Sequence, residues 1–399
     1  MSEIKLLPAS GINNAAEDEA LFVFGDEPKL FLREALNVNI SRMGRVDLMS
    51  QPMPIAVNDD VALSDLWQSP LHKDVFARRG SHLVKVDTKQ ELWATEELAE
   101  VGKAKLHYCL LNNTVCISGA NGIFVYDGMK VEPITIDTPP KPMVANQEDG
   151  SLSGMIGVAV SWLRGAKESA LSEVVFTDCN GYLQVTMPVC ADTSITGAKL
   201  YATTENGGQL LLFETVSAQA RQVVIKSVRK LGVPAKFKNL SPMISGDYLS
   251  YWKGRLIVAK SNVLHFSEAM AYHLYDERHG FVQMPQRITF VVPVEGGLWV
   301  GQIDHVVFLR GSSPDGLTVE HKYTQSPVKD SGILIDAESV NGELSQGGHA
   351  CALWLASNGF VIGTAEGQAI EIHKGTIQGI EANSGNSVVL AQRAYAAIT

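Results

Sequence analysis

The chain is poor in charge: 19% of its 399 residues are Asp, Glu, Lys or Arg, where globular proteins average about 25%. Acidic residues outnumber basic ones by 43 to 33, which gives a formal net charge of −10 at pH 7. A protein that grips duplex DNA or an anionic membrane needs a positive surface. The composition therefore disfavours both classes, while 45% hydrophobic residues argue against a disordered chain.

Cysteine is also scarce, and its five positions form no C-x-x-C pair. The odd number and the spacing predict reduced, mostly buried thiols and folding inside a cell. No stretch approaches the roughly 18 uninterrupted apolar residues of a membrane helix. The first residues lack a basic segment followed by an apolar one, so we expect no signal peptide. The cysteines are Cys109, Cys116, Cys179, Cys190 and Cys351.

What the sequence does contain is a long series of strand signals. Short runs rich in β-branched and aromatic residues are separated by Gly, Asn and Asp, which is typical of antiparallel sheets. Helical periodicity is weak, and residues 94–103 and 267–280 are the best helix candidates. The strand-like runs include residues 82–86, 114–118, 255–259, 263–267, 288–292, 297–301, 305–309 and 360–364.

The strand signals repeat as hairpins of one pattern. Four units share this pattern. Each opens with Gly or Asn, runs through apolar residues, turns after seven or eight residues and runs through a second strand. The units begin at Asn113, Gly254, Gly297 and Gly359. Residues 80–94 resemble a fifth unit. Because propeller blades recur about every 40 to 50 residues, the pattern predicts a β-propeller.

One interval is too long for a blade and predicts an inserted domain. Between loop-like segments 139–154 and 230–242 lie alternating strands with turns at Asn180-Gly181 and Asn206-Gly207, which suits a small β-sandwich. We therefore expect an all-β chain: a propeller with an inserted immunoglobulin- or fibronectin-III-like sandwich and an extended N-terminal arm. The expected domains are the arm with the first propeller strands (1–58), a first propeller segment (59–150), the sandwich (151–232) and a second propeller segment (233–399).

Three groups of segments resemble the tail nozzle or tail hub (tail tube) family of short-tailed bacteriophages. The first is the N-terminal arm, with its GINN turn and the following ALNVNI stretch. The second is the strand pair of the insert, with GAKES and the later LYATTENGG. The third comprises two propeller hairpins that begin GDYLSYWKGRL and GLWVGQ. The segments are residues 7–22 and 32–52, 160–172 and 198–216, and 246–269 and 297–314.

The resemblance implies a virion protein that is not an enzyme. Members of this family form a ring, which implies a hexamer below the portal and adaptor proteins, with tail fibre, needle or tip proteins as further partners. DNA would pass through the lumen during genome ejection without sequence-specific binding, and an acidic lumen would let it slide. The chain would be made in the host cytoplasm and end in the virion tail.

Motifs for catalysis or metal binding are weak, and we expect no catalytic, cofactor-binding or metal-binding residues and no cofactor. There is no phosphate-binding loop, H-E-x-x-H, EF-hand or G-x-S-x-G motif. His265 and His305 alternate within strands and are expected to be structural, since a closed metal site needs about four convergent ligands. Asp330-Ser331-Gly332 resembles half of an aspartic-protease site, but without a second copy it predicts a turn before a strand. Cys351, close to His349, is expected to be buried.

Charged residues form a few local clusters. The basic ones are expected to be solvated or to lie at subunit contacts, and the acidic ones on solvated surfaces or facing the lumen. The basic clusters are Arg78-Arg79 and Lys226, Arg229, Lys230, Lys236 and Lys238; the acidic ones are Glu17-Asp18-Glu19, Asp59-Asp60 and Glu96-Glu97.

Two alternative functions fit a propeller. The first is an attachment protein that binds carbohydrate or another receptor at the mouth of the propeller, because fold does not fix function. A symmetric sugar site would repeat an aromatic residue at one blade position. Three hairpins have an aromatic residue at this position (Tyr126, Phe266 and Phe308), but the fourth has Ile370 or Glu371 there. The second is a propeller hydrolase, disfavoured by the lack of convergent His and carboxylate spacing.

Overall fold

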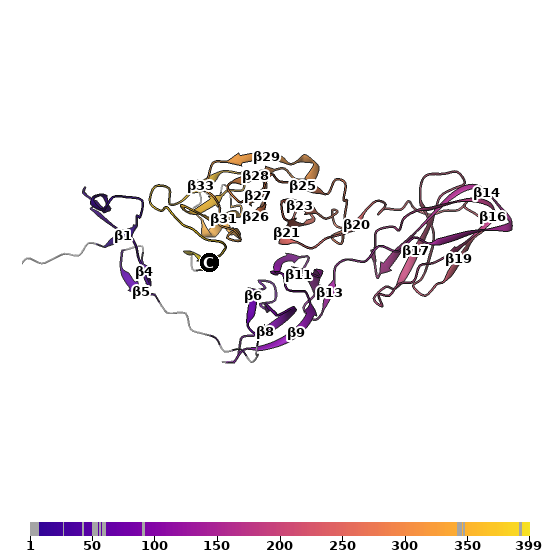
Figure 1. The fold of residues 1–399 in the computed structure, drawn as a ribbon, viewed down its shortest axis with the longest axis horizontal. Helices are drawn as coiled ribbons and strands as arrows, with labels where there is room; N and C mark the ends of the chain where they lie inside the picture. Colours follow the sequence, from indigo (N-terminus) through magenta and orange to yellow (C-terminus); the bar gives the residue numbers. More distant parts are fainter. Residues whose placement is uncertain are drawn as a thin grey trace, which may run out of the picture.

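The computed structural model describes residues 8–26, 28–41, 44–49, 55, 57, 61–89, 92–340, 345, 348–390 and 393–399. Within these residues the chain is an all-β protein with five four-stranded antiparallel sheets, which are the blades of a β-propeller (Figure 1). The four strands of each blade follow one another in order. The expected all-β propeller is therefore confirmed.

We number the blades along the chain. Blade 1 contains β6 (Leu63–Gln68), β7 (Val75–Arg79), β8 (His82–Asp87) and β9 (Ala94–Glu100); blade 2 contains β10 (His107–Leu111), β11 (Thr114–Gly119), β12 (Gly122–Tyr126) and β13 (Val131–Pro133). Blade 3 contains β21 (Asp247–Trp252), β22 (Arg255–Lys260), β23 (Val263–Phe266) and β25 (Phe281–Gln283). Blade 4 contains β26 (Ile288–Val294), β27 (Gly297–Gln302), β28 (Val306–Arg310) and β29 (Thr318–Lys322), and blade 5 contains β30 (Ile333–Ile335), β31 (Cys351–Ala356), β32 (Gly359–Gly363) and β33 (Ala369–Glu371).

The repeated hairpins of the sequence are present, but they are not all the same hairpin. The units at Asn113, Gly254 and Gly297 join the second and third strands of their blades, whereas those at residues 80–94 and at Gly359 join the third and fourth. Hairpin signals look alike in sequence, because any two adjacent strands of a blade have the same alternation and turn. This difference in phase accounts for part of the uneven spacing of the sequence repeat.

Neither helix candidate forms a helix, although the turns that the sequence also allowed at 267–280 are present. Residues 94–100 form β9, the outer strand of blade 1, and residues 267–280 form turns around the two-residue strand β24 (Leu274–Tyr275). The helix-favouring Glu and Ala residues of β9 lie on an edge strand that pairs only with β8. Tertiary pairing thus outweighs a weak local propensity there.

The blades pack through a series of apolar clusters. Phe76 of blade 1 and Ile117 of blade 2 share one cluster, and Phe290 of blade 4 shares another with Trp354 of blade 5. Similar clusters lie between blades 2 and 3 and between blades 3 and 4. Each buried side chain contributes about 1.5–3 kcal/mol, so contact between neighbouring blades provides most of the propeller's stability.

The first strands of successive blades face the middle of the propeller. Strand β10 lies beside β21, β21 beside β26, and β26 beside β30. Residues at the start of these strands therefore converge on the propeller axis from distant parts of the chain. This convergence positions the first candidate site below.

The propeller is interrupted after blade 2 by a six-stranded sheet. Its longest strand pairs first with β16 and then, beyond Val158, with β17, so it passes from one layer to the other. Side chains of both halves meet in one core, as in a β-sandwich. The strands are β14 (Met143–Arg164), β15 (Lys167–Glu168), β16 (Val175–Thr186), β17 (Gly197–Ala202), β18 (Leu211–Ser217) and β19 (Gln222–Ile225).

The expected loop at 139–154 is a strand from Met143 onward. Its polar and glycine-rich sequence looks loop-like because most side chains of 143–151 are at least partly exposed. The backbone nevertheless pairs with β16, with a register shift between Gln147 and Leu152. Strand β20 (Ser241–Pro242), which follows the insert, pairs with β24.

The N-terminal arm forms two small sheets of its own. They contain β1 (Ala9–Ile12), β2 (Phe22–Val23) and β3 (Lys29–Leu32), and β4 (Val38–Ile40) and β5 (Val46–Leu48); the arm also contains the 3-10 turn η1 (Asp18–Leu21). The other 3-10 turns are η2 (Pro314–Gly316) and η3 (Ala337–Ser339). In Figure 1 the arm lies at one end of the molecule, beside blade 5, and the inserted sheet lies at the other.

The arm is tied to the C-terminal region of the chain. The amide of Asn14 donates to the carbonyl of Thr376 at 3.0 Å, and its side chain exchanges hydrogen bonds with the backbone of Gln378. Arg393 donates to Asn39 at 2.6 Å. Arg393 begins β35 (Arg393–Ile398), which pairs with β34 (Gly385–Leu390) in a hairpin packed on blade 5.

Candidate functional site

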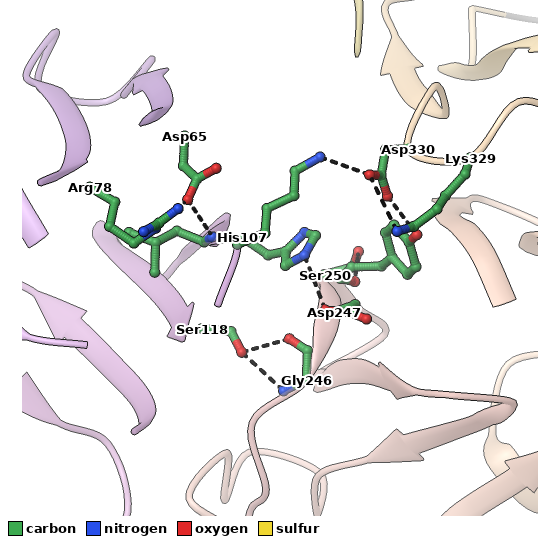
Figure 2. Close-up of polar contacts among 12 residues, drawn as sticks. Asp65, Arg78, His107, Ser118, Gly246, Asp247, Ser250, Lys329 and Asp330 are labelled. Atoms are coloured by element: carbon green, nitrogen blue, oxygen red, sulfur yellow. Dashed lines mark hydrogen bonds and ion pairs between the residues drawn. The ribbon is translucent and has the colours of Figure 1, made fainter. Parts of the chain in front are cut away.

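Polar side chains meet where the first strands of the blades converge on the propeller axis (Figure 2). The innermost strand of blade 1 contributes Asp65, whose carboxylate accepts from Arg78 at 2.7 Å and from the amide of Leu106 at 3.1 Å. The hydroxyl of Tyr108 donates to the Asp65 carbonyl at 3.1 Å. Asp65, at a φ of 55°, thus links blade 1 to blade 2.

Blades 2, 3 and 5 meet at Asp330, which precedes β30. Lys105, just before β10, forms an ion pair with its carboxylate at 3.0 Å, and the hydroxyl of Tyr248 from β21 donates to its other oxygen at 2.6 Å. The Asp330 side chain is only 9% exposed. Burial, with the hydrogen bond to Asp330, raises the pKa of Tyr248 far above its ordinary value, so this hydroxyl remains a donor.

A second polar link joins blades 2 and 3. The imidazole of His107 lies 3.5 Å from the carboxylate of Asp247, and the hydrogen bond with His107 lowers the pKa of Asp247. Close by, the hydroxyl of Ser118 donates to the carbonyl of Gly246 at 2.7 Å and accepts from its amide at 3.1 Å. Figure 2 shows both links beside the Asp330 cluster.

The contacts of the axial cluster hold neighbouring blades together. Its carboxylates accept from lysine, arginine, histidine or tyrosine side chains at fixed positions, and Tyr248 is held in its protonated form. In the region of the chain that the structure describes, no three or more His, Cys, Asp or Glu side chains are placed to hold a metal ion. The expectation of no catalytic and no metal-binding residues stays a prediction.

Asp330-Ser331-Gly332 forms the expected turn before a strand. Asp330 has a φ of 65°, and the buried Ser331 hydroxyl donates to the carbonyl of Val328 at 2.7 Å and accepts from the amide of Leu355 at 3.1 Å. The hydrogen bonds of this turn thus fix the residues that lead into β30, the first strand of blade 5. The role of Asp330 in linking three blades has no signal in the sequence, because Lys105 and Tyr248 are distant along the chain.

The two histidines expected within strands have structural environments, but only His265 lies in a strand, because His305 directly precedes β28. His265 lies in β23 beside the ring of Tyr275, and burial lowers its pKa. His305 is held between the carboxylate of Asp304, 2.5 Å from its Nδ1, and the amide nitrogen of Gln302, 2.7 Å from its Nε2. The two histidines lie in different blades, so they do not form a shared site.

Cys351 is buried, as expected. Burial raises the pKa of its thiol, and the thiol contacts the backbone carbonyl of His349 at 3.7 Å. A raised pKa makes a thiol less reactive. All five cysteines are free thiols in the structure, as the sequence predicts.

The charged clusters of the sequence have several roles. Arg78 pairs with Asp65, and Arg79 pairs with Glu97 at 2.9 Å. Asp18 pairs with Arg33 at 2.6 Å on the surface of the arm. Asp59 and Asp60 lie outside the described residues.

A second candidate site lies between the inserted sheet and blades 2 and 3. The cavity there has a volume of about 570 Å³, within the usual range of ligand pockets. Three lysines line it, from the insert and from the segment that leaves it: Lys167, Lys199 and Lys236. The sequence placed Lys236 in a basic cluster but gave no indication that it lines a cavity.

Glu168 is the buried polar centre of this cavity wall. Its carboxylate accepts from the hydroxyls of Ser161 at 2.7 Å and Tyr201 at 2.6 Å, and from the ammonium of Lys199 at 2.5 Å. Its backbone carbonyl accepts from Nε2 of His273, in the turn before β24, at 2.8 Å. Burial lowers the pKa of His273, and this bond joins the insert to the propeller.

Aromatic residues at the repeated hairpins are unavailable for sugar stacking. Tyr126 is 1% exposed, and Phe266 and Phe308 are fully buried between blades. Exposed aromatic residues lie elsewhere, for example Tyr323. The hairpin aromatics therefore belong to the core.

Comparison with known proteins identifies no family. No family model matches the chain, and no curated protein matches it. Solved structures match only loosely: BBS1N in complex with ARL6DN has 12% identity and a TM-score of 0.33, covering 85% of this chain and 90% of that one. YCF48 from Cyanidioschyzon merolae has 9% identity and a TM-score of 0.30, with coverages of 84% and 90%.

An extracellular domain of a one-component system from B. thetaiotaomicron has 13% identity and a TM-score of 0.29. That alignment covers 86% of this chain, which spans only 38% of the matched chain. These similarities are too low to carry an argument about function. No helix among the described residues has the length and apolarity needed to cross a membrane.

Proposed function

We propose that this chain is a structural subunit of a short-tailed bacteriophage tail, a tail nozzle or hub that is not an enzyme. Copies would assemble as a ring, with six as the number that the sequence resemblance implies, below the portal and adaptor proteins. The genome would pass through the ring at ejection. The protein would be made in the host cytoplasm and function in the virion.

The observation that carries this proposal is the exposed apolar surface of the N-terminal arm. Phe24 is 85% exposed, Leu36 71% and Leu48 87%, and among the described arm residues only Ala9 is buried. Single exposed apolar side chains are common, but several along one segment that buries almost nothing of its own are typical of a surface that other proteins cover. The arm is also a segment that resembles the tail family, so an assembly role explains both its sequence and its exposure.

The propeller axis supports a channel between copies rather than through each propeller. Lys105 and Tyr248, from blades 2 and 3, both donate to the carboxylate of Asp330, which precedes blade 5, across the middle of the propeller. A ring of copies would leave a wider central opening, and a net charge of −10 would limit adhesion of the DNA phosphates. Such a ring would conduct DNA without holding it.

Electron microscopy of the purified protein, and mass spectrometry of purified phage particles, test the proposal. We expect closed rings with a central opening wide enough for duplex DNA, and the chain as a virion component. A stable monomer that is absent from particles would contradict it. A strong, saturable signal on a glycan array would instead favour an attachment protein.

A further inference from the structure

The cavity between the insert and the propeller is a basic site in an acidic protein. Three ammonium groups line it, against one lining carboxylate, that of Glu168. Glu168 already accepts three hydrogen bonds, one of them from Lys199. Within the described residues, Lys167 and Lys236 have no ion-pair partner. The cavity is therefore suited to an anionic group.

Much of the remaining cavity wall is apolar or aromatic, although Asn112, Thr114 and His273 also line it. Phe237 lies on the segment that leaves the insert, and Met270 and Tyr272 lie on the turn between β23 and β24. Met270 is 71% exposed. Lysines beside exposed apolar groups fit a ligand with both acidic and aromatic side chains.

The N-terminal arm has this complementary composition. Glu17, Asp18 and Glu19 are exposed at η1, and two aromatic residues, Phe22 and Phe24, follow directly. The two rings contact each other edge to face at 4.4 Å between centroids. Asp18 already pairs with Arg33, so Glu17 and Glu19, together with the exposed Phe24, match the lysines and apolar wall of the cavity.

An arm cannot reach the cavity of its own chain in the observed arrangement. The arm lies beside blade 5, held by Asn14 at Thr376 and Gln378. The cavity lies at the junction of the insert with blades 2 and 3, and in Figure 1 the propeller separates this junction from the arm. Two different surfaces on opposite sides of one propeller make a head-to-tail contact, which closes into a ring or extends into a filament. This arrangement suits a ring subunit.

We propose that the cavity lined by Lys167, Lys199 and Lys236 receives the acidic aromatic segment 17–24 of a second copy of this chain. The inference rests on the proposed function, since it supplies the contact between neighbouring ring subunits. The lysines attract the carboxylates of the arm, and the apolar wall covers Phe24. Because surface charges are screened by salt, the contact weakens as ionic strength rises.

Paired charge reversals test this contact in the full-length chain. One variant carries Glu17→Lys and Glu19→Lys in the arm, and the other carries Lys167→Glu and Lys236→Glu in the cavity. Each alone is expected to lower the association constant at least tenfold, measured by mass photometry and analytical ultracentrifugation. An equimolar mixture should restore association, since every junction can then join opposite charges. A misfolded variant would not be rescued in this way.

The chain offers matched controls for both variants. Lys238→Glu reverses a lysine two residues from Lys236 that does not line the cavity, and Glu34→Lys reverses an exposed arm carboxylate beyond η1. Both should assemble as the native chain does. A labelled peptide of residues 15–26 should bind the full-length arm variant and lose affinity when Lys167→Ala and Lys236→Ala are added, whereas a scrambled peptide should not bind.

The outcomes separate this inference from the proposed function. Rings that persist in both charge-reversal variants would overturn the arm contact and leave the ring proposal intact. Failure of the mixture to restore association would also overturn the contact. A native chain that stays monomeric would overturn the ring, and with it the contact between copies.

Discussion

Lys105 and Asp330 form an ion pair of 3.0 Å across the propeller axis, although 225 positions separate them in the chain. Lys105 precedes the first strand of blade 2, and Asp330 precedes that of blade 5. The ion pair thus joins a propeller segment that precedes the inserted sheet in the chain to one that follows it. Tyr248 of blade 3 bonds to the same carboxylate.

Removing the Asp330 carboxylate should destabilise the propeller. Asp330→Ala leaves the buried Tyr248 hydroxyl and the Lys105 ammonium without their acceptor, at a cost of about 2–3 kcal/mol. Urea denaturation followed by tryptophan fluorescence measures the loss. The control is Asp336→Ala, because Asp336 is exposed and makes no capping bond to η3. Equal effects of the two substitutions would contradict an axial role for Asp330.

Acid should weaken the fold through one buried and two partly buried histidines. Burial lowers the pKa of His265, His273 and His373, whereas in the unfolded chain their pKa is about 6.5. The unfolded state therefore binds more protons below that pH, so stability is full above about pH 6.5 and declines as the pH falls toward the lowered native pKa values. Thermal midpoints at pH 7.5, 6.5 and 5.5 should decrease in that order.

His273 allows this pH dependence to be assigned. In His273→Gln the side-chain amide can still donate to the carbonyl of Glu168, but it does not titrate. The variant should lose less stability than the native chain between pH 7.5 and 5.5. An identical pH dependence would show that His273 does not contribute.

A methyl group at Gly363 should disrupt the contact between blades 4 and 5. A Cβ there would lie 2.5 Å from the ring of Trp299 and 2.7 Å from that of Trp354. Both rings are fully buried and have little room to move, so Gly363→Ala should cost about 1–3 kcal/mol. The matched control is Gly25→Ala in the arm, where a Cβ meets nothing within 4 Å. Denaturation midpoints compare the two.

Arg164 should hold the segment that enters the insert. Its guanidinium donates to the carbonyls of Pro133 and Thr135 at 2.8 and 3.1 Å, and to the side chains of Asp192 and Ser194. Lysine lacks the planar, forked donors for these contacts, so Arg164→Lys should speed amide exchange in residues 134–144. Arg221→Lys, at an exposed site, should leave exchange unchanged.

The sequence by itself determined the class of fold. Alternation of apolar residues and most of the Gly and Asn turns specify strands and hairpins, since both depend on neighbouring residues. The turn expected at Asn180-Gly181 was wrong, because these residues lie within β16 and pair with β14. The turn at Asn112-Asn113, where both residues have positive φ, is one such local signal. Weak local signals failed where tertiary contacts outweighed them, as in β9 and in the polar first half of β14.

Only the tertiary structure decided which hairpin belonged to which position of a blade and which side chains met. Lys105, Tyr248 and Asp330 converge because the first strands of blades 2, 3 and 5 face one axis. Lys236 lines the same cavity as Lys167, because the segment after the insert returns past the sheet to blade 3. Contacts of this kind depend on chain topology, which the pattern of neighbouring residues does not encode.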